Sequence, residues 1–189
     1  MKPTRTFIAI EPGNAIRDRV VMLQEKLAKT GCDVRWADYD TLHLTLLFLG
    51  EVDQRDLMNV CRAVSGVAAG AAPFAITVEG ANAFPNIRRP KTLWVGVSAG
   101  AQDVCNLHDG IETALLQLGC YRREERAFTP HLTLGRVKGD AAIDDLSKAL
   151  TKTAAWTAGE TTVKEVLVMG SELKSEGPVY TVLSRAKLG

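Results

Sequence analysis

Histidine and net charge are both in short supply in this chain. Only three of the 189 residues are histidine, and 23 Lys and Arg residues against 22 Asp and Glu residues leave a formal net charge of +1. A protein with so little net charge has no overall field that attracts long nucleic acids. Any nucleic-acid partner must therefore be bound locally, at a defined site.

Long apolar runs and closely spaced cysteines are absent too. No stretch approaches the roughly 18 consecutive apolar residues of a membrane span, and residues 1–3 lead directly into a strand-like segment rather than a targeting sequence. We therefore expect a cytoplasmic protein without a membrane partner. Because the cysteines show no CxxC spacing, we expect reduced thiols rather than a zinc site or a disulfide framework; they are Cys32, Cys61, Cys105 and Cys120.

One tetrapeptide, His-Leu-Thr-Leu, occurs twice, at 43–46 and at 131–134, and each copy has a Thr two residues before its His. The copies lie 88 residues apart and contain two of the three histidines. On a β-strand alternate side chains share a face, so the His and Thr of each copy point one way and the leucines the other. Two such strands side by side would bring together two imidazoles and two hydroxyls.

Apolar patterning predicts a mixture of strands and helices. Helical stripes follow Asn14 and Val104 and end near Gly31 and Gly119. Further helices are expected at 53–64 and 143–150, and strands at 7–10, 34–36, 42–49, 74–78, 93–97, 163–169, 179–183 and around the second tetrapeptide. Because strands and helices do not alternate strictly, we expect an α+β fold. The repeat indicates one bilobal, pseudo-symmetric domain over 1–189, with two antiparallel sheets, outer helices and a central cleft that carries both motif strands.

Two histidines suit acid-base chemistry at a phosphodiester. The ordinary imidazole pKa of about 6.5 allows one copy to be protonated while the other is neutral. His43 and His131 are therefore the candidate acid and base. The hydroxyls of Thr45 and Thr133 are candidate donors to the phosphoryl oxygens. Arg136 is a candidate charged clamp, but strict alternation places it on the leucine face, so it needs a twist, a bulge or the strand end to reach the phosphate.

Other residues carry weaker signals. His108 flanks a helical stripe without the motif, and we expect it to be structural. Arginine clusters at 88–91 and 122–126 are more often solvated loops, although either could hold an RNA backbone. Phe84 and Phe128 could stack on a base, but buried aromatic side chains are commoner.

Metal catalysis and nucleoside triphosphate hydrolysis both lack a motif. Two histidines without a nearby set of carboxylates or cysteines give too few ligands for a zinc or two-metal site. No GxxxxGK[ST] loop is present to cradle phosphates. We therefore expect neither a metal nor a cofactor.

Paired His-x-Thr-x motifs in a chain of this length resemble the two-histidine phosphoesterase superfamily, and specifically the bacterial RNA 2',3'-cyclic phosphodiesterases, also called 2'-5' RNA ligases. The resemblance extends to blocks at 7–10, 42–50, 84–85, 93–97, 130–136 and 177–180. It implies the bilobal α+β fold and metal-free hydrolysis of an RNA 2',3'-cyclic phosphate to a 2'-phosphomonoester. It also implies that His43 donates a proton to the departing 3' oxygen and that His131 activates water. The residues alone do not order these roles. Family members can also join RNA ends by the reverse reaction, which uses the same acid and base.

Two other interpretations stay open. One is a non-catalytic module that binds RNA ends or nucleotides, although two intact motifs argue against a decayed enzyme. The other is a phosphodiesterase for small cyclic or 2',5'-linked nucleotides. The modest net charge favours short ends or small molecules over long duplexes. We therefore expect RNA ends or small cyclic-phosphate nucleotides as partners, and a monomeric protein.

Overall fold

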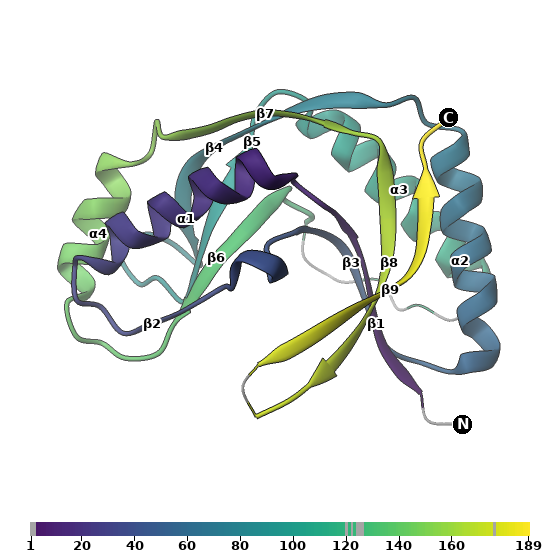
Figure 1. Ribbon diagram of the computed structural model, residues 1–189, viewed down its shortest axis with the longest axis horizontal. Helices are drawn as coiled ribbons and strands as arrows, with labels where there is room; N and C mark the ends of the chain where they lie inside the picture. Colours follow the sequence, from purple (N-terminus) through teal and green to yellow (C-terminus); the bar gives the residue numbers. More distant parts are fainter. Residues whose placement is uncertain (1–2, 120, 122, 124–126, 176) are drawn as a thin grey trace.

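The computed structural model describes residues 3–119, 121, 123, 127–175 and 177–189 (Figure 1). In this part of the chain nine strands form one antiparallel sheet in the order β7-β4-β5-β6-β3-β1-β8-β9, and β2 pairs with β6. The strands are β1 (Thr4–Ile10), β2 (Val34–Trp36), β3 (Leu44–Val52), β4 (Phe74–Phe84), β5 (Thr92–Val97), β6 (His131–Val137), β7 (Thr157–Val163), β8 (Glu165–Leu173) and β9 (Pro178–Lys187). The helices are α1 (Asn14–Ala28), α2 (Gln54–Ala69), α3 (Ala101–Gln117) and α4 (Ile143–Lys152), with a short 3-10 helix η1 (Tyr39–Thr41).

The eight strands in this order divide into two halves of four, one from β7 to β6, which β2 joins through β6, and the other from β3 to β9. A single register pair, between Leu44 of β3 and Leu132 of β6, joins them. The α+β class and the two-lobed arrangement are therefore confirmed. The expected pair of sheets is in fact one strongly curled sheet, because the two motif strands pair with each other at the boundary.

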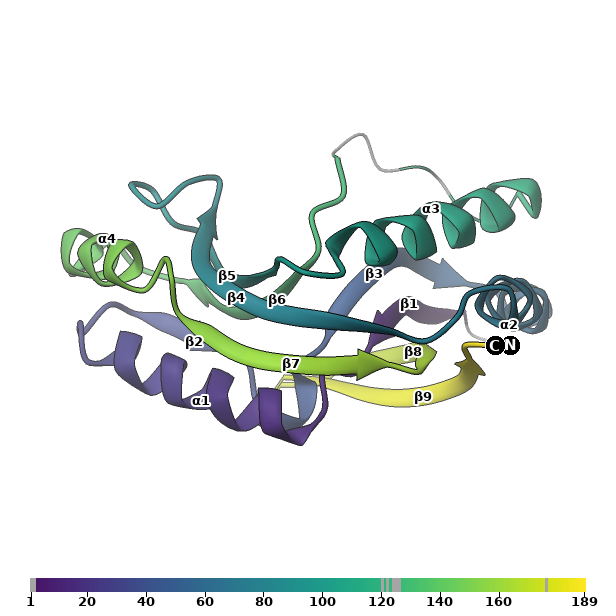
Figure 2. The ribbon, with the colours of Figure 1, turned by 90° about the horizontal axis from the view of Figure 1, so that it is seen from above.

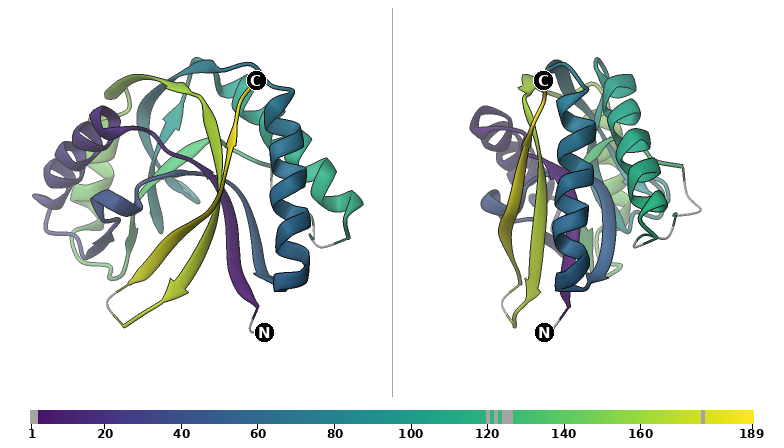
Figure 3. Two further views of the ribbon diagram at one scale, coloured as in Figure 1. Left: turned by 45° about the vertical axis from the view of Figure 1, so that its right-hand side comes forward. Right: turned by 90° about the vertical axis from the view of Figure 1, so that its right-hand side faces the viewer.

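Two of the helices, α1 and α3, pack on the half of the sheet opposite to the strand that they follow. Helix α1 follows β1 in the chain but packs with α4 against the β7–β6 half, where it contacts β7. Helix α3 follows β5 but packs with α2 on the other half, where it contacts β3. Figures 2 and 3 show the two helix pairs on opposite sides of the molecule. This packing ties the halves together, so the motif strands between them are held from both directions.

The predicted helical stripes form much of the core. In α1 the apolar stripe is fully buried, and α3 behaves in the same way up to Leu115. Leu118, which the pattern assigned to the α3 stripe, lies beyond the helix and is 44% exposed. Gly31 and Gly119 follow their helices with φ of 76° and 69°, values that glycine adopts without a Cβ penalty.

The sequence analysis did not predict strand β7. Strand β7 (Thr157–Val163) is rich in Thr and Gly and pairs with β4 alone, at an edge of the sheet, so it has little apolar alternation. Strand β4 also continues to Phe84, six residues past its predicted end, because pairing with β5 holds this segment. Among the described residues no helix is long and apolar enough to cross a membrane.

Candidate active site

The two motif strands are neighbours at the centre of the sheet. Strands β3 and β6 pair at Leu44 and Leu132, the second residue of each tetrapeptide. Both leucine side chains are buried in the core, so the flanking His and Thr side chains lie on the opposite face, called here the site face. Antiparallel pairing sets the His of each copy beside the Thr of the other copy. The structure thus brings together His43, Thr45, His131 and Thr133.

Each motif strand carries a β-bulge at the end of its tetrapeptide. In β3 the partners of Ile8 and Ala9 are Leu47 and Thr45, so Leu46 is unmatched. In β6 the partners of Leu93 and Trp94 are Gly135 and Thr133, so Leu134 is unmatched in the same way. A bulge puts two successive residues on one side of the strand. Both strands accordingly show two consecutive buried residues, after which the strict alternation of faces is shifted by one.

Strict alternation would place Arg136 on the leucine face, but the bulge in β6 moves it to the site face. Leu134 and Gly135 are both buried, and Arg136 is exposed on the face that also carries His131 and Thr133. The charge of Arg136 acts on the phenol of Tyr180, which lies on the other half of the sheet beside His43. Arg136 therefore faces the junction between the halves, where the two imidazoles meet.

The bulge in β6 is held by groups from helix α1, from β2 and from the residue that follows β2. The buried side chain of Gln24 in α1 donates from Nε2 to the carbonyl oxygens of Leu134 and Ala37, both at 2.9 Å. The Ala37 N–H donates to the same Leu134 oxygen at 2.9 Å. A Cβ on Gly135 would lie 2.8 Å from the carbonyl oxygen of Arg35, so the close approach of β2 requires glycine there. These contacts fix the backbone that directs Arg136.

Both catalytic candidates have the same hydrogen bond on one ring nitrogen. His43 Nδ1 lies 2.6 Å from the carbonyl oxygen of Thr41, and His131 Nδ1 lies 2.7 Å from that of Thr129. A carbonyl oxygen only accepts, so each Nδ1 carries a proton and donates it. Each Nε2 is therefore the nitrogen left to take or give a proton. The Thr two residues before each His contributes its backbone carbonyl to this hydrogen bond, and the Thr41 hydroxyl donates to the Asp38 carbonyl oxygen at 2.8 Å.

Two aromatic side chains pack against each imidazole. His43 lies 4.9 Å from Phe7 and 5.4 Å from Tyr180 between ring centres, and His131 lies 5.1 Å from Phe84 and 5.8 Å from Trp94. This burial lowers the pKa of both imidazoles, because it disfavours the charged form, and the hydrogen bond to the carbonyl opposes the shift only in part.

The positive charge of Arg17 and the second imidazole lower the pKa of His43 further. Arg17 stands at the start of α1, where it pairs with Glu11 at 3.0 Å. The two histidines therefore share a hydrogen-bond pattern but differ in their electrostatic surroundings.

The structure adds residues that the sequence analysis did not select. Tyr180 stands in the last matching block, and its half-buried phenol packs edge-on against His43. Burial raises the pKa of Tyr180, and the charges of Arg136 and Arg5 oppose that rise. Arg5 and Tyr180 both pair with Ser171 of β8, which places them on one face. Only the assembled sheet brings these side chains to the motifs, so spacing could not have revealed Arg5.

Several weaker candidates lie away from the site face. His108 is buried in α3, where its Nδ1 lies 2.8 Å from Asp109 Oδ1. Its ring stacks on that of Phe128 with the ring centres 4.1 Å apart, so both side chains have a packing role. Arg123 pairs with Glu112 at 3.1 Å. Cys120, Arg122 and Arg126 lie outside the described residues.

Cysteines and metal ligands are not gathered at a site in the described ranges. The described thiols of Cys32, Cys61 and Cys105 are unpaired, and burial raises the pKa of each. No group of three or more His, Cys, Asp or Glu side chains there is arranged to hold a metal ion.

Comparison with known proteins agrees with this geometry. Residues 7–174 match the model of the 2'-5' RNA ligase superfamily. The chain belongs to that superfamily. It is 33% identical over 177 residues to a Methanothermobacter thermautotrophicus protein named RNA 2',3'-cyclic phosphodiesterase, with 94% of this chain and 95% of that protein covered.

Solved structures of the superfamily confirm the fold. A Thermus thermophilus crystal structure superposes with a TM-score of 0.83 at 28% identity, with 97% of both chains covered. Escherichia coli LigT complexed with 3'-AMP superposes with a TM-score of 0.74 at 25% identity, with 98% of both chains covered. The resemblance inferred from the paired motifs is therefore confirmed, whereas the roles of the individual residues stay predictions.

Proposed function

We propose that this protein hydrolyses RNA 2',3'-cyclic phosphate ends to 2'-phosphomonoesters with His43 and His131 as the acid-base pair. Thr45, Thr133 and Arg136 bind the non-bridging phosphoryl oxygens. The observation that carries the proposal is the antiparallel pairing of the two motif strands, which sets both imidazoles and both hydroxyls on one face. Relatives named RNA 2',3'-cyclic phosphodiesterase support the choice of substrate.

The reaction is an in-line displacement at phosphorus. A water oxygen forms a bond to phosphorus while the bond from phosphorus to the 3' oxygen breaks. His131 Nε2 takes the proton of the water, and His43 Nε2 gives a proton to the departing 3' oxygen. Exchange with solvent then restores both protonation states. Joining of RNA ends follows the same course with a 5'-hydroxyl in place of water. The 5' oxygen bonds to phosphorus, the bond from phosphorus to the 3' oxygen breaks, and a 2'-5' linkage remains, with the same two groups moving the protons.

The negative charge of the substrate helps the acid to hold a proton taken from solvent. Because burial lowers the pKa of both imidazoles, each favours the neutral form in the free protein. A phosphate anion beside an imidazole raises its pKa, so substrate binding favours the protonated acid. Arg136 and the two threonine hydroxyls supply donors to the oxygens that gain charge in the transition state.

Incubation with an oligoribonucleotide that ends in a 2',3'-cyclic phosphate, in the presence of EDTA, tests the proposal. We expect a 2'-phosphomonoester end, identified by its sensitivity to a general phosphomonoesterase, which the cyclic phosphate resists, together with its resistance to a 3'-phosphate-specific phosphatase. Activity that disappears in EDTA and returns with a divalent ion would contradict a two-histidine mechanism. Binding of the ends without turnover would favour the non-catalytic module, and turnover of small cyclic nucleotides alone would favour that narrower substrate class.

Two further properties belong to this proposal. RNA ends are substrates of the cytoplasm, and reduced thiols fit that compartment, so we infer a cytoplasmic location. We also infer a monomer, since both motifs come from one chain and the site needs no second copy. Size-exclusion chromatography with light scattering tests the monomer, and a mass twice that of the 20.5 kDa chain would contradict it.

A further inference from the structure

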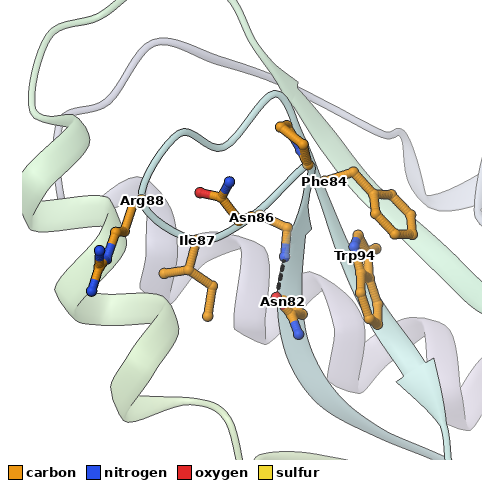
Figure 4. Close-up of a pocket in the computed structure, with 8 residues that line it drawn as sticks. Asn82, Phe84, Asn86, Ile87, Arg88 and Trp94 are labelled. Carbon is orange, nitrogen blue, oxygen red and sulfur yellow. Dashed lines mark hydrogen bonds between the residues drawn. The ribbon is translucent and has the colours of Figure 1, made fainter.

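A pocket of about 630 Å³ opens beside the His131 half of the site. Its walls are the end of β4, the start of β5 and the loop between them; the lining residues that the argument uses are Asn82, Phe84, Asn86, Arg88 and Trp94 (Figure 4). Its size is ordinary for a small-molecule subsite, which ranges over roughly 300 to 1,000 Å³. The acid-base chemistry makes no use of this pocket.

Two residues that line the pocket, Phe84 and Trp94, also contact the His131 imidazole. Phe84 and Trp94 stack on each other with ring centres 4.9 Å apart, and both rings contact His131. Trp94 pairs with Thr133 on one side and with Asn82 on the other, so these three side chains share the site face. The two aromatic rings that line the pocket therefore separate it from the His131 imidazole.

The polar groups of the pocket are donors. Asn82 Oδ1 accepts from the Ala83 N–H at 2.8 Å, and Asn86 Oδ1 accepts from the Arg89 N–H at 3.0 Å. A backbone N–H can only donate, so these bonds fix the amide orientation and leave each NH2 group as a donor. Arg88 adds an exposed guanidinium. The indole N–H of Trp94 is buried and has no hydrogen-bond partner in the described part of the chain.

Hydrogen bonds hold the loop that forms the pocket in the free protein. The Lys91 N–H donates to the Phe84 carbonyl oxygen at 2.8 Å and closes the loop. Ser147 of α4 donates its hydroxyl to the Ile87 carbonyl oxygen, which anchors the tip of the loop to a helix. A preformed pocket loses little conformational entropy on binding, so even a few contacts there contribute to affinity.

We propose that this pocket is a subsite for a second nucleotide, adjacent to the one that carries the reacting phosphate. Donor groups suit the acceptor-rich, anionic phosphodiester and the carbonyl edges of a base, and the aromatic wall suits its flat face. This inference rests on the proposed function. The second nucleotide comes from one of two sources, the 5' neighbour in the cyclic-phosphate strand or the 5'-hydroxyl strand that replaces water when RNA ends are joined.

Two measurements on the whole chain separate these sources. The first compares kcat/KM for a 2',3'-cyclic mononucleotide with that for a dinucleotide that ends in the same cyclic phosphate. The second measures inhibition of mononucleotide hydrolysis by a 5'-hydroxyl dinucleotide without a cyclic end. For the wild type we expect at least one preference, a higher kcat/KM for the dinucleotide or inhibition by the 5'-hydroxyl strand.

Variants of the loop identify the pocket as the cause. Arg88→Ala should lower the preferred reaction about tenfold, as expected for one charge-assisted contact, and leave mononucleotide hydrolysis within about twofold. Arg89→Ala is the matched control, because it removes the same charge from the next residue, which does not line the pocket. Asn86→Ser keeps an oxygen for the Arg89 N–H but lacks the amide donors, so it should behave like Arg88→Ala.

The outcomes are distinct. Loss of the dinucleotide preference in Arg88→Ala assigns the pocket to the 5' neighbour, and loss of inhibition assigns it to the 5'-hydroxyl strand. The inference is overturned by a wild type with neither preference, or by equal effects of Arg88→Ala and Arg89→Ala. A wild type that turns over neither cyclic substrate overturns the proposed function itself.

Discussion

The surroundings of His43 and His131 are alike for five residues and then differ. Both strands show the same sequence of half-buried and buried positions from the His onward, and both carry the bulge. The next residue is Phe48 in one strand, 54% exposed, and Arg136 in the other, at the same offset of 88 residues. Phe48 pairs with Phe7, which packs on His43, so both side chains face the site. The repeat supplies two matched imidazoles, whereas this difference places an arginine after one tetrapeptide and a phenylalanine after the other.

The difference between Phe48 and Arg136 makes the two sides of the site chemically distinct. We expect Arg136, on the strand of His131, to attract the phosphoryl oxygens. The other strand has the apolar Phe48 at this position, beside Phe7, and the ring of Tyr180 borders His43. The charges of Arg17 and Arg5 act on that side as well, on His43 and on Tyr180. The donor-lined pocket also lies on the His131 side. We therefore expect residues outside the repeat to orient a substrate with one charged centre. Variants that remove the groups shared by the two halves come first below, followed by variants of the residues that distinguish the halves.

Removal of the shared imidazoles should have the largest effect. We expect His43→Ala and His131→Ala each to lower turnover at least about a hundredfold, the lower end for loss of a general acid or base. His108→Ala is the control, since this ring packs on Phe128 away from the site face. Rates should be measured on variants whose circular dichroism and thermal unfolding match the wild type. Similar losses at all three positions would indicate general destabilisation instead.

Replacement of Arg136 by the phenylalanine found at the corresponding position 48 should have the next largest effect on kcat. Arg136→Phe makes the two halves alike and removes the charge from the phosphate, so we expect kcat to fall about ten- to a hundredfold, near the lower range for a lost transition-state donor. Arg136→Lys should recover part of the rate, because it restores the charge without the planar fork. Phe48→Ala should change kcat much less. Wild-type kinetics in Arg136→Phe would show that the side chain does not reach the substrate.

The hydroxyls are shared by both halves but carry no charge, so their loss should cost less. We expect Thr45→Val and Thr133→Val each to lower kcat about tenfold, as expected for a neutral donor at a partly wet site. Thr→Ser at either position should restore most of the rate, since it keeps the hydroxyl. A serine variant as slow as the valine variant would assign the threonine a packing role instead.

Much of this arrangement was readable in the sequence. The two imidazoles and hydroxyls follow from the repeat, and the helical stripes follow from apolar spacing. The orientation of Arg136 did not follow, because it depends on a bulge that Gln24 stabilises from 110 residues away in the chain. Strand β7 was missed because an edge strand needs no apolar alternation. The part beyond prediction was thus created by contacts between distant segments.

Gln24 should act on catalysis only through that bulge. Gln24→Met keeps the volume but removes both donated hydrogen bonds, so we expect a stability loss of about 1 to 2 kcal/mol and a few-fold lower kcat. A double-mutant cycle separates the two effects. In an Arg136→Ala background, Gln24→Met should still destabilise the fold but should not lower kcat further. A full additional loss of kcat would contradict a role through Arg136.

The smallest expected effect concerns the electrostatic difference between the two histidines. Because burial lowers the pKa of both, the bell-shaped profile of kcat/KM should have its optimum below the ordinary histidine value of about 6.5. Arg17 lowers the pKa of His43 in addition, so Arg17→Met should raise that pKa and shift one limb towards higher pH. If His43 is the acid, the alkaline limb moves, since the acid then keeps its proton to higher pH. Movement of the acidic limb would exchange the roles. Titration of the histidine ring protons by NMR gives the independent readout, and an unchanged His43 in Arg17→Met would mean that Glu11 already screens the charge.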